Sequence, residues 1–189
     1  ADYRMLAIHG VVGDFTEHLG RIPGQTPRIV AFLGGTIGNL FPEERASFLA
    51  ELRDTLVGDE WLLLGTDLVK DPDILVPAYD DAAGVTAEFN RNVLAVLNRQ
   101  LGADFDVQNY EHVAVWDPDN EWIEMRLRST GPALVSLTEL DLDIVVEAGE
   151  EIRTEISAKF RREGVERELV KAGFSLDCWW TDPEGRFAL

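Results

Sequence analysis

A short apolar run that stops at two glycines and restarts as a helix constrains the fold most strongly. The tract RIVAFLGGTIGNLFPEE (28–44) begins with an almost unbroken apolar run, which is typical of a strand covered on both faces. Pro42 suits the first position of a helix, where its missing N–H would be unpaired anyway. The next apolar run, 61–64, predicts a second buried strand. The sequence therefore predicts a βαβ unit.

The spacing of apolar residues predicts which face of this helix is buried. Ala46, Leu49, Leu52 and Leu56 recur at intervals of three and four residues, which places them in one stripe. Gly58 is suited to follow the end of the helix.

The topology of a βαβ unit predicts where a ligand would bind. Open α/β sheets bind ligands beyond the carboxyl ends of their strands, here residues 34–39 and 65–67. Asn39 lies in the first segment, and two interpretations stay open: it caps a turn before the helix, or it contacts a ligand. The glycine pair favours ligand contact, because backbone without side chains allows another group to approach closely.

Length and charge limit the class of protein. The 189 residues fit one domain, or one domain with an inserted subdomain. The formal net charge of −18, from 17 basic and 35 acidic residues, opposes binding to nucleic acid or anionic lipid. No apolar run approaches the roughly 18 residues of a membrane helix. We therefore expect no nucleic-acid partner and no membrane association.

The few cysteines and histidines predict neither a disulfide nor a metal site. The single cysteine, Cys178, excludes an internal disulfide, is compatible with a cytoplasmic location, and is predicted to be a small core residue. The three histidines lack the spacing of two ligands on one helical turn, so no metal is expected.

The middle of the chain reads as a small α+β insertion. Residues 71–84 predict a loop because they are polar and contain two prolines, and Thr86 predicts the N-cap of a helix that ends at Gly102. A hairpin is predicted from 110–116 and 122–127. Further extended segments, a helix ending at Gly173 and a terminal hairpin are predicted over the following ranges: 140–146, 151–160, 165–173, 174–180 and 187–189.

The segment IRTEISA (152–158) is the second place with chemical interest, because its residues alternate. In an extended conformation Glu155 and Ser157 face the same side, and a carboxylate beside a hydroxyl suits an imidazole or a guanidinium. An exposed strand face with alternating charges is the other interpretation. A helical conformation would separate the two side chains.

Several motifs together resemble a known enzyme family. They are GDF ending at Phe15, FLGGTIGN followed by LFPEER, YDDAAGVTAEFNRNVL, and RTEIS before KF. The combination resembles the histidine-specific Nα-methyltransferases of ergothioneine biosynthesis over essentially the whole chain. The resemblance implies an α/β, Rossmann-like methyltransferase fold with an inserted α+β substrate-recognition subdomain. It also implies transfer of three methyl groups from S-adenosylmethionine (SAM) to the α-amino group of L-histidine, which gives hercynine.

The resemblance also implies a domain division and cofactor contacts. Residues 1–70 would form part of the SAM-binding domain, 71–150 the inserted substrate-binding subdomain, and 151–189 the return to the methyltransferase sheet and a terminal hairpin. The GDF motif implies contact of Asp14 and Phe15 with the adenine end of SAM, although Asp14 alone reads as a turn residue. Gly34 would lie beside cofactor and substrate.

The substrate contacts are implied in the same way. Asn39 and Tyr79 would hold the amino and carboxylate ends of histidine. Glu155 and Ser157 would bind its imidazole. Met125 matches a wall position of the pocket, and without the resemblance it reads as a core residue.

One departure from the family leads to a further expectation. Family members carry an upstream segment with a glycine-rich cofactor loop, and the present sequence lacks it, so we expect an N-terminal truncation. We expect residues 1–189 alone to bind SAM poorly and to be inactive, since the missing segment is needed to complete the cofactor site; tight binding in calorimetry would contradict this. Two alternatives stay open, a methyltransferase of the same fold for another amino acid and a non-catalytic interaction module.

Overall fold

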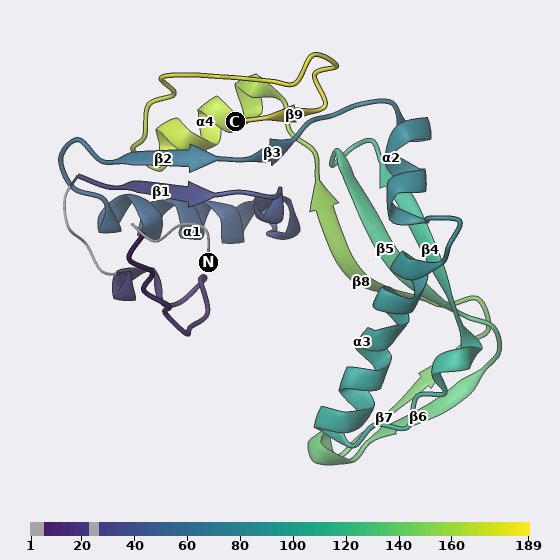
Figure 1. The fold of residues 1–189 in the computed structure, drawn as a ribbon. Helices are drawn as coiled ribbons and strands as arrows, with labels where there is room; N and C mark the ends of the chain where they lie inside the picture. Colours follow the sequence, from purple (N-terminus) through teal and green to yellow (C-terminus); the bar gives the residue numbers. More distant parts are fainter. Residues whose placement is uncertain (1–5, 23–26) are drawn as a thin grey trace.

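A computed structural model describes residues 6–22 and 27–189 of the chain. Figure 1 shows two bodies of structure, one built from the two ends of the described chain and the other from its middle. One cluster of buried apolar side chains lies in the second body, and another joins the first body to the adjoining ends of β5 (Trp122–Ser129) and β8 (Glu151–Ala158). Within the described ranges, no helix is long and apolar enough to cross a membrane.

The first body contains the predicted βαβ unit. Strands β1 (Ile29–Phe32) and β2 (Trp61–Leu64) are parallel neighbours, and helix α1 (Pro42–Thr55) connects them. The helix begins at the predicted proline, and the carboxylate of Glu44 accepts the backbone N–H of Phe41 at 2.7 Å. This capping contact satisfies a donor that has no partner inside the helix.

Helix α1 buries a slightly different face from the predicted stripe. Ala46 is exposed, and the adjacent Arg45 is buried instead. The guanidinium of Arg45 donates to both carboxylate oxygens of Glu168 in helix α4 (Arg162–Lys171), at 2.9 and 3.0 Å. Because a buried charge is tolerated when it is paired, this ion pair allows arginine where the stripe predicted an apolar residue.

Strand β1 is covered on one face rather than on both, so that expectation is wrong for the described residues. Val30 and Phe32 are half-buried, whereas Ile29 and Ala31 are exposed. The ring of Phe32 packs 4.7 Å from that of Phe48 in α1. The helix therefore covers one side of the strand, and the other side stays open.

The second body is built on an antiparallel sheet. Its strand order is β4 (Tyr110–Asp117), β5 (Trp122–Ser129) and β8 (Glu151–Ala158), which confirms the predicted hairpin. A second two-stranded sheet, which the sequence predicted only in part, packs with helix α3 around the core of this body. The remaining elements here are α2 (Pro72–Tyr79), α3 (Val85–Leu101), η3 (Val107–Asn109), β6 (Ala133–Leu137), η4 (Thr138–Leu140) and β7 (Leu142–Val146).

Helix α2 occupies most of the segment that was predicted to be a loop. Pro72 is the first helical residue, and the carboxylate of Asp71 accepts the backbone N–H of Asp73 at 2.9 Å. Proline at the first helical position and aspartate before it are favourable, so the helix forms in spite of Pro77 in its interior. The prediction gave the prolines too much weight as helix breakers.

Helix α3 begins one residue before Thr86, so the prediction of Thr86 as its N-cap is wrong. Gly84 is the N-cap, and the carboxylate of Asp81 accepts the backbone N–H groups of Val85 and Thr86 at 3.1 and 2.7 Å. These bonds, that to Thr86 most strongly, lower the pKa of Asp81 to about 2. The helix ends, as predicted, at Gly102.

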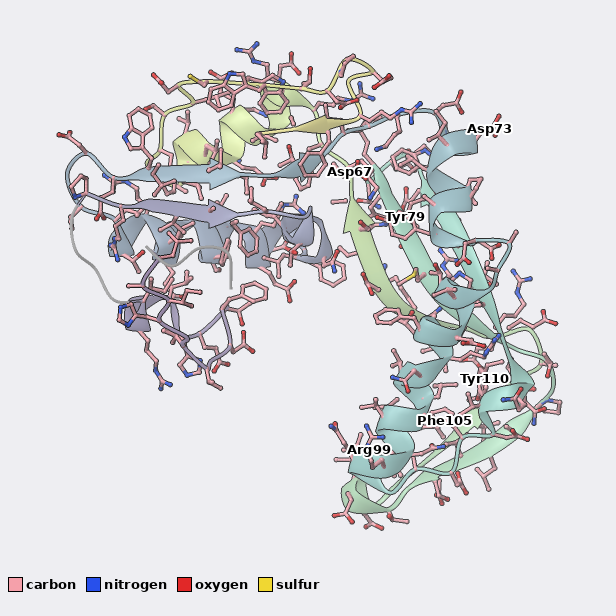
Figure 2. The ribbon with its side chains drawn as sticks, in the orientation of Figure 1. Asp67, Asp73, Tyr79, Arg99, Phe105 and Tyr110 are labelled. Carbon is pink, nitrogen blue, oxygen red and sulfur yellow. The ribbon has the colours of Figure 1, made fainter. Side chains whose placement is uncertain are left out.

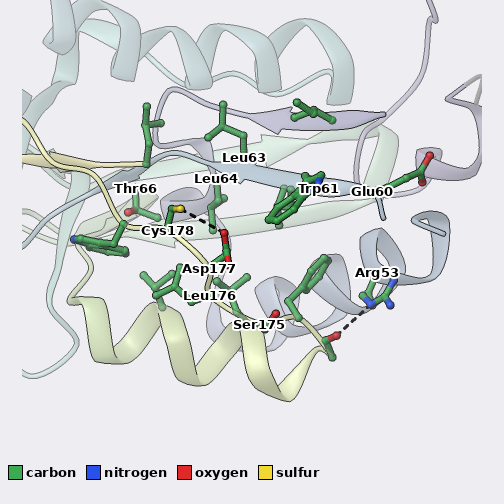
Figure 3. A pocket seen from close by; sticks show the side chains of 18 of the residues that line it. Arg53, Glu60, Trp61, Leu63, Leu64, Thr66, Ser175, Leu176, Asp177 and Cys178 are labelled. Atoms are coloured by element: carbon green, nitrogen blue, oxygen red, sulfur yellow. Dashed lines mark hydrogen bonds between the residues drawn. The ribbon is translucent and has the colours of Figure 1, made fainter. Parts of the chain in front are cut away.

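The end of the chain forms the predicted antiparallel hairpin only next to its turn: Thr181 pairs with Ala188, and Trp180 and Leu189 exchange two backbone hydrogen bonds of 2.9 Å. Strand β9 (Phe187–Ala188) pairs with β3 (Thr66–Asp67), and residues 174–180 contain no strand. Residues 174–180 and strand β2 line a cavity of about 670 Å³, which Figure 3 shows from close by. Cys178 is exposed there rather than in the core, and its thiol donates to Asp177 at 3.4 Å.

The two bodies meet where the 3-10 helix η2 (Thr36–Asn39) lies against β8. Gly38 is buried at this contact, and a Cβ placed on it would lie 2.7 Å from the carbonyl oxygen of Ala158. The backbone N–H of Phe160 also donates to the carbonyl oxygen of Asp67 at 2.8 Å. The end of β8 is therefore fixed against the first body on two sides.

Candidate functional site

Polar side chains from four separate segments come together at this junction. Asn39 ends η2, Asp67 lies in β3, Tyr79 ends α2, and residues 155–159 form the end of β8 and the residue after it. Figure 2 shows Asp67 and Tyr79 where the two bodies adjoin. The junction lies beyond the carboxyl ends of β1 and β2, which is the edge at which the sequence predicted a ligand.

Asn39 contacts β8 rather than capping the helix that follows it. Its amide nitrogen Nδ2 donates to Oε1 of Glu155 at 3.0 Å. The N-terminal N–H of Phe41 is already bonded to Glu44, so Asn39 is not needed as a cap for α1. The structure thus brings together two predicted site residues that are 116 positions apart in the sequence.

Tyr79 and Ser157 form a second pair beside the first. The hydroxyl oxygens of Tyr79 and Ser157 lie 2.7 Å apart, within hydrogen-bond distance. Segment 152–158 is extended, as one interpretation of its alternation required; Ser157 is buried and Glu155 is half-buried. The interpretation as an exposed, solvated strand face is therefore wrong for these two residues.

Sequence reasoning missed Lys159, which lies at the centre of the second pair. Its ammonium donates to the hydroxyl oxygens of Tyr79 and Ser157 at 2.7 and 2.8 Å, and lies 3.1 Å from Oδ2 of Asp67. The signal was present, because the alternation that selects Glu155 and Ser157 reaches Lys159 two residues later.

Met125 lies next to Glu155 in the sheet. It is only 4% exposed and sits directly opposite Glu155 in the β5–β8 ladder. Directly opposite residues of an antiparallel ladder project from the same face. Met125 therefore has the burial of a core residue and also a position from which it can border the Glu155 side chain.

The three predicted cofactor residues lie apart from these pairs. Asp14 is exposed in a turn, and its carboxylate accepts the hydroxyl and backbone N–H of Thr16 at 2.6 and 2.8 Å, which lowers the pKa of Asp14. The ring of Phe15 is 42% exposed and lies 5.4 Å from that of Phe32 in β1. Gly34 follows β1 in a left-handed conformation with φ +83°, and almost no atoms surround the place of its missing Cβ.

A metal centre and a cavity are two other kinds of site that the described part of the chain could contain. No group of three or more histidine, cysteine, aspartate or glutamate side chains in it could hold a metal ion. The cavity of Figure 3 lies along β2, and none of the predicted site residues lines it.

The surroundings of Glu155 change the pKa of its carboxyl group. Burial raises the pKa of the Glu155 carboxyl above its ordinary value, and the positive charge of Lys159 opposes this shift. The ionised carboxylate is therefore held in a partly desolvated place. A ligand that donates an N–H there would replace some of the lost hydration.

This shift predicts a pH-dependent effect on stability. A raised folded-state pKa means that the ionised Glu155 destabilises the fold, and the penalty grows as the pH rises from the ordinary value of 4.5 through the folded-state value. The Glu155→Gln variant should therefore melt a few degrees higher than wild type at neutral pH and equally at a pH well below 4.5. Thermal unfolding at both pH values measures this. The exposed Glu166→Gln serves as control, and a Glu155→Gln effect that is equal at both pH values would contradict the argument.

Comparisons with known proteins identify the family of the chain. A family described as histidine-specific, SAM-dependent methyltransferases matches residues 1–189. The histidine N-alpha-methyltransferase of Mycolicibacterium smegmatis is 58% identical over 189 residues, and that of Mycobacterium tuberculosis is 53% identical over 188 residues. In both comparisons the match covers 100% of this chain and 59% of the relative, so the chain spans about three fifths of their length.

A more distant relative is also similar to the chain over most of the chain's length. Ergothioneine biosynthesis protein 1 of Neurospora crassa is 26% identical over 188 residues, with 95% of this chain and 20% of that protein covered. The chain belongs to the family of SAM-dependent, histidine-specific methyltransferases.

Proposed function

We propose that the protein containing this chain transfers three methyl groups from SAM to the α-amino nitrogen of L-histidine, giving hercynine, as a step of ergothioneine biosynthesis. The observation that carries the proposal is the family match over residues 1–189, combined with the meeting of the Asn39–Glu155 and Tyr79–Ser157 pairs at one junction. Residues 71–150 would form the subdomain that recognises the substrate.

The two pairs suit the groups of histidine. A neutral imidazole has one N–H donor and one bare nitrogen acceptor, and the carboxylate of Glu155 accepts while the hydroxyl of Ser157 donates or accepts. Asn39 and Tyr79 would orient the amino and carboxylate ends. Met125, beside Glu155, would form the wall of the imidazole pocket.

The features near β1 fit SAM. The partly exposed ring of Phe15 offers an aromatic surface for adenine, Asp14 precedes it, and the open backbone at Gly34 leaves room for close approach. SAM supplies an activated methyl group when bound. We infer that further contacts to SAM come from the part of the relatives' length that this chain does not span.

The work of the chain's own residues would be alignment of the amine and exclusion of water. The acceptor nitrogen must lose a proton, because an α-amino group has a pKa of about 8 in peptides and only the free amine is nucleophilic. We assign no general base. Asn39 and Tyr79 would hold the amine, and the partly buried site would disfavour its charged form.

The test uses the full-length protein with SAM and single amino acids. We expect products with one, two and three added methyl groups from histidine, followed by mass spectrometry. Preferred methylation of another amino acid would support a methyltransferase of different specificity, and the L-tryptophan methyltransferase of Psilocybe serbica, 26% identical over 167 residues, makes tryptophan the first comparison. Lack of turnover with every amino acid would favour the non-catalytic alternative.

A further inference from the structure

Lys159 is a buried cation with every donor in use. Its side chain is 0% exposed, and its ammonium contacts Tyr79, Ser157 and Asp67 at 2.7, 2.8 and 3.1 Å. An ammonium has three N–H groups, so these three contacts satisfy it completely. Removing a charge of this kind from water is costly unless it is paired, and Asp67 is the carboxylate that pairs with it.

The donors and acceptors of Lys159, Tyr79 and Ser157 can be counted to find which hydroxyl protons remain without a partner. Lysine only donates, so the hydroxyl oxygens of Tyr79 and Ser157 each accept one N–H from Lys159. The two hydroxyls lie 2.7 Å apart and share one O–H···O bond, which uses the proton of one of them. The proton of the other hydroxyl has no acceptor within the cluster. The Tyr79–Ser157 pair therefore presents one O–H donor to a ligand.

Glu155 provides the opposite character on the same strand. Its carboxylate accepts hydrogen bonds, and its position two residues before Ser157 places both side chains on one face of β8. A ligand at this face meets an acceptor, Glu155, next to a hydroxyl pair that offers one O–H donor. Histidine carries an N–H and acceptor atoms that match this order.

We propose that Lys159 is a positioning residue that sets substrate specificity: it keeps the Tyr79–Ser157 pair in the state that donates to an acceptor atom of histidine. This inference rests on the proposed function. Without Lys159, the two oxygens regain the lone pairs that the ammonium occupies, so the pair accepts hydrogen bonds as readily as it donates one, and its preference for an acceptor atom is lost.

A purely structural role for Lys159 predicts different results, and Lys70 provides the matched control. Lys70 also contacts the carboxylate of Asp67, and it donates to the carbonyl oxygen of Arg186 at 3.1 Å. Lys70 contacts Oδ1 of Asp67, whereas Lys159 contacts Oδ2. Replacing Lys70 therefore removes an ion pair to Asp67 without removing a donor to Tyr79 or Ser157.

The experiment compares Lys159→Met and Lys70→Met in the full-length protein. Methionine has a similar length, no donors and an apolar body that suits a buried place. We expect Lys159→Met to raise the KM for histidine roughly tenfold, because the hydroxyl pair then no longer favours donation to the substrate and about one hydrogen bond is lost. The Kd for SAM, measured by calorimetry, should stay at the wild-type value, and Lys70→Met should keep the wild-type KM.

A double-mutant cycle with Ser157→Ala separates positioning from support of the fold. If Lys159 acts through the hydroxyl pair, the double variant raises the KM much less than the product of the two single effects. Lys159→Gln retains an N–H donor and should recover part of the histidine affinity; it also replaces Lys159→Met in the cycle should that variant not fold.

Three results would overturn the inference, each in a distinguishable way. An unchanged KM for histidine in a folded Lys159→Met would contradict the positioning role alone. Multiplicative effects in the cycle, with equal weakening of histidine and SAM, would assign Lys159 a structural role. A wild-type protein that does not methylate histidine would instead contradict the proposed function, and this inference with it.

Discussion

In the full-length protein, the Glu155→Ala variant should show a KM for histidine that is roughly 10- to 100-fold higher than wild type, with the KM for SAM unchanged. The carboxylate is half-buried, and burial raises its pKa, so it is a poorly hydrated acceptor that a ligand N–H can satisfy. Its removal withdraws a charge-assisted hydrogen bond from the substrate and none from the cofactor side.

Stability should change little in this variant, which separates a binding effect from misfolding. The amide of Asn39 loses its partner, but Asn39 is exposed, so water can replace the carboxylate. Steady-state kinetics with each substrate varied in turn measures both KM values, and Glu166→Ala on the exposed face of α4 is the control. Equal increases in the two KM values would show that Glu155 does not bind the imidazole.

The Gly38→Ala variant should lose about 1–3 kcal/mol of stability, because its Cβ meets backbone rather than a flexible side chain. The added carbon would lie 2.7 Å from the carbonyl oxygen and 3.2 Å from the nitrogen of Ala158. Helix η2 would have to move away from β8. The Asn39–Glu155 hydrogen bond would lengthen with it, so histidine affinity should fall together with stability.

Urea unfolding measures the stability loss, and Gly131→Ala is the matched control. Gly131 has no atoms within 4 Å of the place of its missing Cβ and no positive φ, so the same substitution there meets no obstacle. A Gly38→Ala variant as stable as Gly131→Ala would mean that the contact between η2 and β8 is not tightly packed. That outcome would also remove the steric reason for glycine at this position.

The local part of the fold could be predicted from the sequence because its signals are local. The glycines after β1 and the proline at the start of α1 set the junction from which Asn39 projects. Alternation within 152–158 identified the extended segment, since side-chain direction in a strand depends only on residue parity.

Other features depend on partners far away in the sequence and could not be predicted in this way. Arg45 is buried only because Glu168 neutralises it, and no periodicity in α1 shows that ion pair. Strand β9 pairs with β3 as well as with the preceding segment, and short-range turn signals predict only the second of these pairings. Such pairings follow from tertiary packing rather than from local preference.

The site was predicted unevenly for the same reason. Topology supplied Asn39, strand alternation supplied Glu155 and Ser157, and the motif resemblance added Tyr79. The structure brings these residues together in two hydrogen-bonded pairs. Lys159 escaped notice because a lysine at a strand end usually reaches solvent, and only the positions of Asp67 and the hydroxyl pair show that it is held inside.

Strand β8 belongs to the sheet of the second body and ends against the first body, so its backbone sets the spacing of the site residues that it carries. Side chains on one face of a strand follow each other at intervals of about 6.6 Å, so the backbone sets the distance between Glu155 and Ser157. Lys159 follows two residues after Ser157, just beyond the end of the strand. Ala158, the last residue of the strand, packs against Gly38 of the first body, which fixes this end of β8. Replacing Glu155, the site residue farthest from this fixed end, should therefore change which amino acid the proposed pocket accepts. The distance from the nitrogen of that amino acid to SAM should stay the same.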